Sequence, residues 1–534
     1  MAMQFNSYRP MVMGSKWLIT ADHPLAAQAG AAVLEAGGNA VDAAVAANLV
    51  MTVVRPHMCG LGGDLFALVY TAQNGKLEAL NATGRSPHAA TLKWYREKGH
   101  KKIPDHGILT ATVPGAMDGW QELLDRHGTK KLADLLERPI FYAEHGFPMY
   151  GELAQAIEQR RNLLKESQAA YEVFLPGGEV PVVGTGLKQK DMARSLRLFA
   201  EQGPKFLYQG ELGEALVKFS DQTGGLFKEK DLADHFHTWE EPISTDYKGY
   251  EICSQPPNSQ GIALLMQANM LENFDLKKMG FGSAELVHLM VEAKKLAFAD
   301  RNQHVCDPAF YPVPVDALLD KEYAKTRAGL IDPKKAAKNP PAGDFTKGGT
   351  DTIYLAVVDS QGNAVSLIQS LFEPFGSCVM IPGTGVFLHN RGRGFTLKEG
   401  HVNRLEPHKR PYHTLHPAMV LKDGSPYMVL GTPGADGQTQ TIIQLLVNML
   451  EFKADPQQAS DAPRWRSNPD GTLLIEGRFA AETIKGLSLR GHQLEVLPDW
   501  SLIMGSSQTI MVDRAQGVLL GGACPRRQAY AIAS

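Results

Sequence analysis

Two threonines near residue 350 could supply a hydroxyl nucleophile for catalysis, because they lie at the start of an expected strand. The segment KGGTDTIYLAVVDSQGNAVSLIQS, residues 347–370, places Thr350 and Thr352 directly before an alternating apolar run. A threonine hydroxyl is a poor nucleophile unless a base takes its proton. If the chain is cut before the threonine, its own α-amine, with an ordinary pKa of about 7.7–8.0, can be that base. The same hydroxyl could make the cut by attacking the preceding peptide carbonyl.

The segments on either side of these threonines suit such a cut. Residues 331–351, IDPKKAAKNPPAGDFTKGGTD, are rich in Lys, Pro and Gly and have no apolar period, which indicates a mobile surface linker. Residues 353–358 alternate as a strand does. A β-hairpin that turns at DSQGN explains the same letters without any chemistry. The local pattern leaves both explanations open and does not choose between Thr350 and Thr352.

The bulk composition excludes several classes of protein. A chain of 534 residues is longer than one hydrophobic core usually supports, so two or more domains are expected. Its 44% hydrophobic and 21% charged residues are typical of a soluble globular protein. A formal net charge of -3 gives no reason to expect nucleic acid or an anionic membrane as a partner.

The cysteines and the N-terminal residues indicate a reduced, cytoplasmic protein. Five scattered cysteines without C-x-x-C spacing favour neither a disulfide framework nor a zinc site. His413 and His416 could be read as metal ligands, but no third ligand suggests itself, so we expect neither a metal nor a cofactor. The first residues lack the apolar core of a signal peptide, and no apolar run reaches membrane-spanning length.

From about residue 115 to 300 the pattern is mainly helical, and the residues after 352 read mainly as strands. Two alanine-rich helices are expected within 23–54, hinged at Gly37-Gly38, with Asn39 as an N-cap and Asp42 in the first turn. After residue 352, alternating runs such as TIYLAVVD, NAVSLIQS, SCVMIPG and PYMVLGT predict strands, and QTIIQLLVNMLEF predicts an amphipathic helix. This mixture favours an α/β sandwich.

Several motifs, in one order along almost the whole chain, resemble the γ-glutamyltransferase family of N-terminal-nucleophile hydrolases. They are GGNAVDAAVAANLVMTVVRPHMCGLGGDLFALVY, ATVPGAMDGWQELLDRHGTKKLADLL, PPNSQG, DTIYLAVVDSQGNAVS, FGSCVMIPGTGVFLHNR, VLGTPGADGQTQTIIQLLVNML and DAPRWR. The resemblance implies a four-layered αββα sandwich. It also implies self-cleavage into a large segment, 1–351, and a small segment, 352–534, which stay together as a heterodimer. Whether that heterodimer dimerises further is left open.

The resemblance also assigns catalytic roles. The family's T-T-H-Y-S-V-V-D segment matches TIYLAVVD, which implies Thr352 as the nucleophile and a cut between Asp351 and Thr352. The family's second threonine, whose hydroxyl bonds to the nucleophile, falls on Ser370. The Gly-Gly pair whose backbone N–H groups form the oxyanion hole falls on Gly434-Ala435, a mild change for backbone donors.

The chain departs from the family where a γ-glutamyl group would be recognised. An asparagine, a glutamine and an aspartate hold the α-ammonium in the family, and the matching residues here are Phe372, Arg391 and Gly394. An arginine repels an ammonium and holds a carboxylate, often through two hydrogen bonds. The serine pair that binds the α-carboxylate matches His413-Thr414. These changes indicate that glutamyl recognition is dismantled.

Two further positions are candidates. Arg85, in NATGRSPH, lies near the place of the family's carboxylate-binding arginine, although a surface arginine explains it equally well. The family's D-P-R-R segment reads CPRR here, with Cys524 in place of the aspartate, and the sequence does not explain this change.

We therefore expect a self-processed amidohydrolase that cleaves the amide of a small carboxylate-bearing molecule. Glutaryl-type acylases and oxamate amidohydrolase are the two kinds of relative that fit, and Phe372 favours a short acyl group. One alternative is a true γ-glutamyl hydrolase or transpeptidase with an altered pocket. Another is an uncut, inactive relative that serves as a binding or scaffold protein.

Overall fold

The computed structural model describes residues 8–337 and 352–534. The expected cleavage residue Asp351, Thr350 and residues 338–351 of the expected linker lie outside these ranges. Among the helices of the described ranges, none combines the length and the apolar character needed to cross a bilayer.

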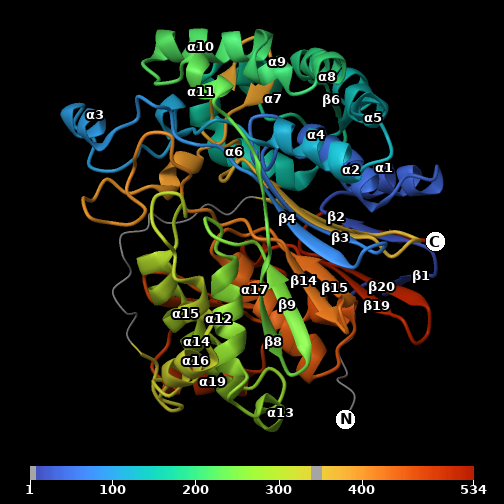
Figure 1. The fold of residues 1–534 in the computed structure, drawn as a ribbon, viewed down its shortest axis with the longest axis vertical. Helices are drawn as coiled ribbons and strands as arrows, with labels where there is room; N and C mark the ends of the chain where they lie inside the picture. Colours follow the sequence, from blue (N-terminus) through green and yellow to red (C-terminus); the bar gives the residue numbers. More distant parts are fainter. Residues whose placement is uncertain (1–7, 338–351) are drawn as a thin grey trace.

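Two antiparallel sheets lie face to face at the centre of the molecule (Figure 1), and each has seven strands. The first sheet has the order β21 (Tyr530–Ala533), β2 (Leu18–Ala21), β10 (Ile353–Val358), β11 (Ala364–Ser370), β3 (Asp64–Thr71), β4 (Lys76–Ala82) and β7 (Thr238–Glu240). The second has the order β1 (Val12–Gly14), β20 (Val518–Ala523), β19 (Gln508–Asp513), β15 (Ser425–Gly431), β14 (Ala418–Lys422), β9 (Tyr250–Ser254) and β8 (Ile243–Tyr247).

Helices cover the outer face of each sheet. On the first sheet lie α1 (Pro24–Glu35), α2 (Ala40–Val54), α4 (Ala116–His127) and α5 (Leu132–His145), followed outward by α6 (Gly151–Glu166), α7 (Gln168–Phe174), α8 (Lys190–Gln202), α9 (Lys205–Tyr208), α10 (Glu211–Thr223) and α11 (Glu229–Ala233). On the second lie α12 (Gly261–Leu271), α14 (Ala284–His304), α17 (Gly437–Leu446), α16 (Lys321–Ala328) and α19 (Ala481–Leu489). The expected four-layered αββα sandwich is confirmed.

The remaining elements are short. They are α3 (Leu92–Glu97), α13 (Leu276–Met279), α15 (Val315–Leu319), α18 (Pro456–Asp461), β5 (Phe147–Pro148), β6 (Gly186–Leu187), β12 (Met380–Ile381), β13 (Val386–Phe387), β16 (Trp465–Ser467), β17 (Thr472–Glu476) and β18 (Gln493–Leu497). The strand expected in SCVMIPG is reduced to β12, because Cys378, with a φ of 58°, and Gly383, with a φ of 72°, turn the chain on either side.

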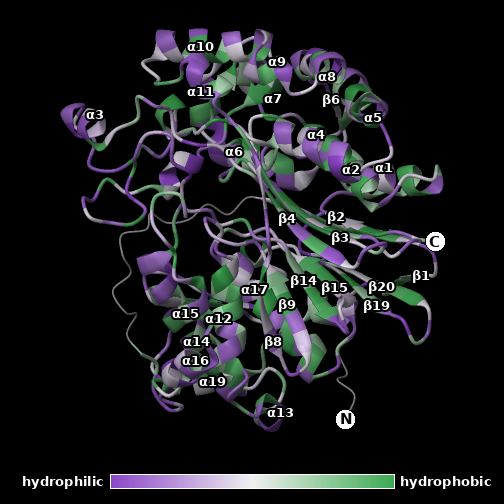
Figure 2. Ribbon diagram, viewed as in Figure 1, coloured by the Kyte–Doolittle hydropathy of each residue, from purple (hydrophilic) through white to green (hydrophobic). Residues whose placement is uncertain are grey.

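Strand β10 is apolar along its whole length because both of its faces are buried. Tyr354, Ala356 and Val358 pack into the layer between the sheets, with Phe66, Val429 and Ile510 among their neighbours. Ile353, Leu355 and Val357 point the other way, into the core beneath α1 and α2. Both faces of the strand are therefore buried, and green, hydrophobic stretches run along strands of both sheets in Figure 2.

The alanine-rich helices are confirmed. Asn39 caps α2 by accepting from the N–H groups of Val41 and Asp42, while an Asp42 carboxylate oxygen accepts from the Asn39 N–H at 2.9 Å. Every residue of α2 is buried. Small alanine side chains let the helix fit between α1, α5 and the first sheet.

The helix expected over QTIIQLLVNMLEF has no exposed polar face. Helix α17 and the π-turn after it, Val447–Glu451, are buried on all sides. Gln440 and Gln444 use their amides as strand partners: each accepts from a backbone N–H of β16 and donates to a backbone carbonyl there. The predicted helix is present, but its polar side chains face another strand instead of water.

Candidate active site around Thr352

Thr352 lies at the start of the central strand β10 and is buried, with 1% of its surface exposed. Its side-chain hydroxyl donates to the Ser370 hydroxyl at 3.2 Å. Ser370 is the last residue of β11, the neighbouring strand, whose Gln369 pairs with Ile353. The family resemblance predicts that these two hydroxyls meet. The sheet register, in which Ile353 pairs with Gln369, brings them into contact.

Ser370 is also the middle of a row of three side chains. Across the sheet it pairs with Asp64, the first residue of β3. Because residues directly opposite each other on neighbouring antiparallel strands point to the same face, Asp64 lies beside the two hydroxyls. The Ser370 hydroxyl also accepts from the Phe372 N–H at 2.6 Å. Phe372 has a φ of 81°, so the chain turns away immediately after the strand.

Gly434 and Ala435 lie in the loop between β15 and α17. This loop begins close to Thr352, because Gly431 at the end of β15 packs directly against the ring of Tyr354. Gly434 has a φ of 134° and Ala435 a φ of 48°. In the described part of the chain neither residue's N–H donates a hydrogen bond, whereas both carbonyls accept one from within the next helix turn. Two such backbone donors could hold an oxyanion.

Arg391 lies in a short 3-10 turn, Arg391–Gly394, and is almost fully buried. Its Nη1 donates to the Thr414 hydroxyl at 3.1 Å, and its guanidinium carbon lies 4.2 Å from the centre of the Phe372 ring. Its Nε and Nη2 have no hydrogen-bond partner among the described residues. Burial lowers the pKa of Arg391 to about 10, so it stays charged at neutral pH.

Asp64 and His389 complete this part of the site, and sequence reasoning did not identify them. His413 Nδ1 accepts from the Leu415 N–H, so its Nε2 carries the proton and donates to Asp64 Oδ2 at 3.2 Å. His389 Nδ1 accepts from the Arg391 N–H, which turns its Nε2 toward Asp64 Oδ1 at 3.7 Å. The only sequence signal for Asp64 was its place in the glycine-rich turn GLGGDLF.

Burial governs the titration of these groups. It raises the pKa of Asp64 to about 7, although Arg391 and the Gly84 N–H act in the opposite direction. It lowers the pKa of His389 to about 3 and that of His413 well below its usual range, so both imidazoles are neutral donors at neutral pH.

The Arg85 side chain points away from the site, although the residue before it contacts Asp64. The preceding N–H, that of Gly84, donates to Asp64, but the Arg85 guanidinium stacks over Phe236 at 3.7 Å and donates to the Phe236 carbonyl. No hydrogen bond or ion pair within residues 8–337 and 352–534 joins Arg85 to Thr352 or Arg391.

Cys524 is buried between two arginines. Arg526 Nη1 lies 3.4 Å from its sulfur, and the Nε and Nη2 groups of the same arginine form a bidentate ion pair with Glu476. Burial alone would raise the pKa of the Cys524 thiol, but the Arg464 and Arg526 guanidiniums outweigh it and lower the pKa. The thiol therefore occupies a positive environment that would suit the aspartate of the D-P-R-R pattern.

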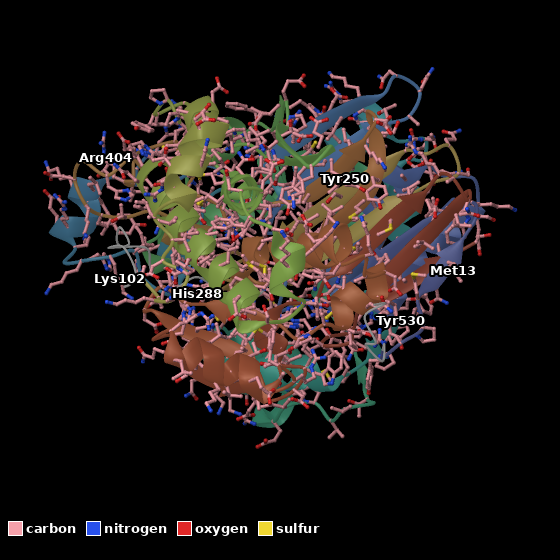
Figure 3. The ribbon with its side chains drawn as sticks, turned by 90° about the horizontal axis from the view of Figure 1, so that it is seen from below. Met13, Lys102, Tyr250, His288, Arg404 and Tyr530 are labelled. Atoms are coloured by element: carbon pink, nitrogen blue, oxygen red, sulfur yellow. The ribbon has the colours of Figure 1, made fainter. Side chains whose placement is uncertain are left out.

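The histidine pair considered from the sequence does not form a metal cluster in the described residues, since His413 faces Asp64 and His416 Nδ1 faces the Ser254 hydroxyl. A different trio, His288, Glu292 and His492, lies together (His288 is labelled in Figure 3). His288 Nδ1 lies 2.8 Å from His492 Nε2, and the Glu292 carboxylate accepts from Lys295 Nζ. Because that ammonium already balances the carboxylate, we assign no metal to the trio.

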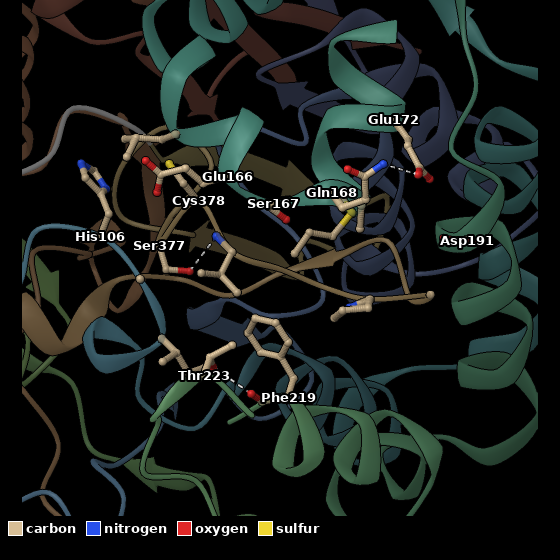
Figure 4. Close-up of a pocket in the computed structure, with 18 residues that line it drawn as sticks. His106, Glu166, Ser167, Gln168, Glu172, Asp191, Phe219, Thr223, Ser377 and Cys378 are labelled. Carbon is tan, nitrogen blue, oxygen red and sulfur yellow. Dashed lines mark hydrogen bonds between the residues drawn. The ribbon is translucent and has the colours of Figure 1, made fainter. Parts of the chain in front are cut away.

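A cavity of about 760 Å³ opens elsewhere, between α6, α7, α10 and the loop that contains Cys378 (Figure 4). His106, Glu166, Glu172, Asp191 and Phe219 are among its lining residues. None of the residues placed above around Thr352 lines it.

Comparisons with known proteins bear on the family and the fold of the chain. Residues 26–534 match the gamma-glutamyltranspeptidase family. The chain is 42% identical to the glutathione hydrolase-like YwrD proenzyme of Bacillus subtilis, over 98% of this chain and 99% of that one. It is 36% identical to the oxamate amidohydrolase proenzyme of Klebsiella pneumoniae, over 95% and 97%. The crystal structure of cephalosporin acylase from Bacillus halodurans superposes with a TM-score of 0.93 at 37% identity, over 100% and 98%.

Proposed function

Because the chain belongs to the gamma-glutamyltranspeptidase family, whose relatives here are hydrolases and acylases, we propose that it is a self-processing amidohydrolase with Thr352 as its nucleophile. Its substrate would be a small amide whose acyl group carries a carboxylate, of the oxamate or glutaryl type. The buried, open edge of Arg391 is the observation that carries this proposal.

Processing would begin with attack of the Thr352 hydroxyl on the carbonyl carbon of Asp351. The peptide bond would shift to an ester, and water would cleave that ester to free the Thr352 α-amine. The two relatives compared above are named as proenzymes. Strand β10 lies between β2 and β11, so the first sheet would contain strands from both segments, 1–351 and 352–534. The fragments would therefore remain joined as a heterodimer after cleavage.

Turnover would use the same hydroxyl. The freed α-amine would take the hydroxyl proton as Thr352 attacks the amide carbonyl, and the Gly434 and Ala435 N–H groups would stabilise the oxyanion. The amine would leave with a proton, and water would hydrolyse the acyl-threonine ester. The Ser370 hydroxyl, 3.2 Å from the nucleophile, would orient it.

The charges in the pocket support the choice of acyl group. Arg391 offers Nε–H and Nη2–H, which lie parallel along one edge of the planar guanidinium and match the two oxygens of a carboxylate. Phe372 covers one face of the guanidinium and keeps water from it. Thr414 fixes the opposite side. Arg85 stays a candidate for a more distant part of the substrate, since it directly follows Gly84, whose N–H donates to Asp64.

A true γ-glutamyl hydrolase is the second candidate, and Asp64 favours it. Its carboxylate lies 3.8 Å from Arg391 and could receive the α-ammonium that Gly394 cannot. Glutaryl and γ-glutamyl anilides differ only by that ammonium, and they should be assayed side by side with oxamate. We expect glutaryl anilide or oxamate to have the higher kcat/KM, and a preference for γ-glutamyl anilide would refute the first candidate. A chain that stays uncut on a denaturing gel would support the scaffold alternative.

A further inference from the structure

Asp64 and Arg391 are oppositely charged side chains that meet at the proposed carboxylate site. Asp64 Oδ2 lies 3.8 Å from Arg391 Nε, near enough for attraction but too far for a hydrogen bond. Both side chains are buried, with 0% and 1% of their side-chain surface exposed. The carboxylate thus faces the guanidinium edge that has no hydrogen-bond partner.

A substrate carboxylate at this edge would create a charge problem. With Asp64 ionised, the buried pair is neutral, and a second carboxylate would leave one uncompensated negative charge away from water. Uptake of one proton by Asp64 removes that charge. The proton would come from solvent, and the pocket would again contain one positive and one negative group.

We propose that Asp64 determines the charge specificity of the acyl pocket: a carboxylate-bearing acyl group takes the open edge of Arg391 when Asp64 takes up a proton. This inference rests on the proposed substrate class and adds a residue to it. In the empty pocket Asp64 keeps Arg391 electrically balanced, and in the complex the protonated carboxyl remains beside the substrate as a neutral group.

The surroundings of Asp64 single it out as the titrating group. The charged and titratable groups that face it are His389, Arg391, His413, Arg410 and Tyr208. Burial keeps the pKa of both imidazoles far below neutrality, and it raises the pKa of Tyr208 well above its usual range. Arg391 has a pKa of about 10. Within this group only Asp64, with a pKa of about 7, changes its charge near neutral pH. In the cut chain the Thr352 α-amine, with an ordinary pKa of about 7.7–8.0, titrates as well, and it is the same in the wild type and in an Asp64 variant.

The sign of the pH effect follows. Below about pH 7 Asp64 is already protonated and a carboxylate binds without proton uptake. Above pH 7 Asp64 must take its proton from a solution whose proton concentration falls as the pH rises. The dissociation constant of the carboxylate should therefore rise about tenfold for each pH unit. A neutral acyl group needs no proton and should bind equally well across this range.

The test uses the processed protein and the free acids of the two proposed acyl groups, glutarate and oxalate, as competitive inhibitors between pH 6 and 8.5. We expect their inhibition constants to rise about tenfold per unit above pH 7 in the wild type. In Asp64→Asn, whose amide cannot titrate, this rise should be lost, and any slope that remains near pH 8 comes from the Thr352 α-amine, which the wild type shares. Asp423→Asn, an exposed carboxylate in the turn after β14, is the matched control and should behave as the wild type does.

Calorimetry of the wild type keeps the proposal testable if Asp64→Asn fails to fold or to process. Glutarate binding in buffers of different ionisation enthalpy should take up about one proton at pH 8 and almost none at pH 6. Binding without proton uptake at pH 8, or an unchanged pH slope in Asp64→Asn, would overturn the role of Asp64 while leaving the substrate class intact. If neither acid binds at any pH, the substrate class itself fails.

Discussion

The hydroxyl of Thr352 donates to the hydroxyl of Ser370 across two neighbouring strands that belong to the proposed small segment. The contact joins the first residue of that segment to a residue at the far end of its first hairpin. It holds the proposed nucleophile in one orientation, although Thr352 would be the first residue of the small segment and no other part of that segment precedes it.

Thr352→Ala should abolish self-cleavage, because no hydroxyl remains at the position where the ester must form. A denaturing gel after long incubation should show a single full-length band, whereas the wild type should give two fragments. Thr350→Ala is the matched control and should be cut normally. Fragments from Thr352→Ala that separate at the bond before residue 352 would refute the assignment.

Ser370→Ala should slow both cleavage and turnover. The substitution leaves the buried Phe372 N–H without its acceptor and removes the partner of the Thr352 hydroxyl. At about 1–3 kcal/mol for such a loss, rates should fall by a factor of about 5 to about 150. Ser370→Thr restores the hydroxyl and should recover most of the rate. Single-turnover acylation of the cut enzyme measures this, and an unchanged rate in Ser370→Ala would contradict the role.

Gly434→Ala should impair catalysis more than Ala435→Gly. The φ of 134° at Gly434 is one that an alanine adopts only with strain of about 1–3 kcal/mol, although the space for a methyl group exists. If the strained loop moves its N–H away from the oxyanion, kcat should fall by about two orders of magnitude. Glycine accepts the φ of 48° at position 435 without strain, so Ala435→Gly should keep most of its activity. Equal effects on kcat would argue against this oxyanion hole.

Arg391→Lys should raise KM for carboxylate-bearing substrates by about tenfold to a hundredfold with a smaller change in kcat. A lysine keeps a positive charge but loses the planar edge that holds two oxygens. Steady-state kinetics with a glutaryl amide and with an uncharged acyl amide of equal length measure the effect, which should be confined to the first. Arg404→Lys, at a partly exposed ion pair with Glu406, serves as the control. An equal loss with both amides would mean that Arg391 has only a structural role.

Local chemistry alone was enough to predict several elements. The alternation in TIYLAVVD predicted β10, and Asn39 with Asp42 predicted the start of α2, because strand period and helix capping depend on neighbours in the chain. The family motifs indicated Thr352, Ser370 and the pair Gly434-Ala435, which the sheet register and the loop after β15 bring to one end of the sandwich.

Only the tertiary structure decided which groups surround the pocket. Asp64 meets Ser370 and Arg391 because β3 pairs with β11 and the chain turns back after Phe372, and neither event leaves a periodic signal in the sequence. The same is true of Gln440 and Gln444, whose amides bond to β16 where a solvent-facing surface was expected. The sequence determines which residues can do chemistry, whereas long-range pairing decides which charges share a buried space, and the cost of burying charge makes that choice decisive for the substrate.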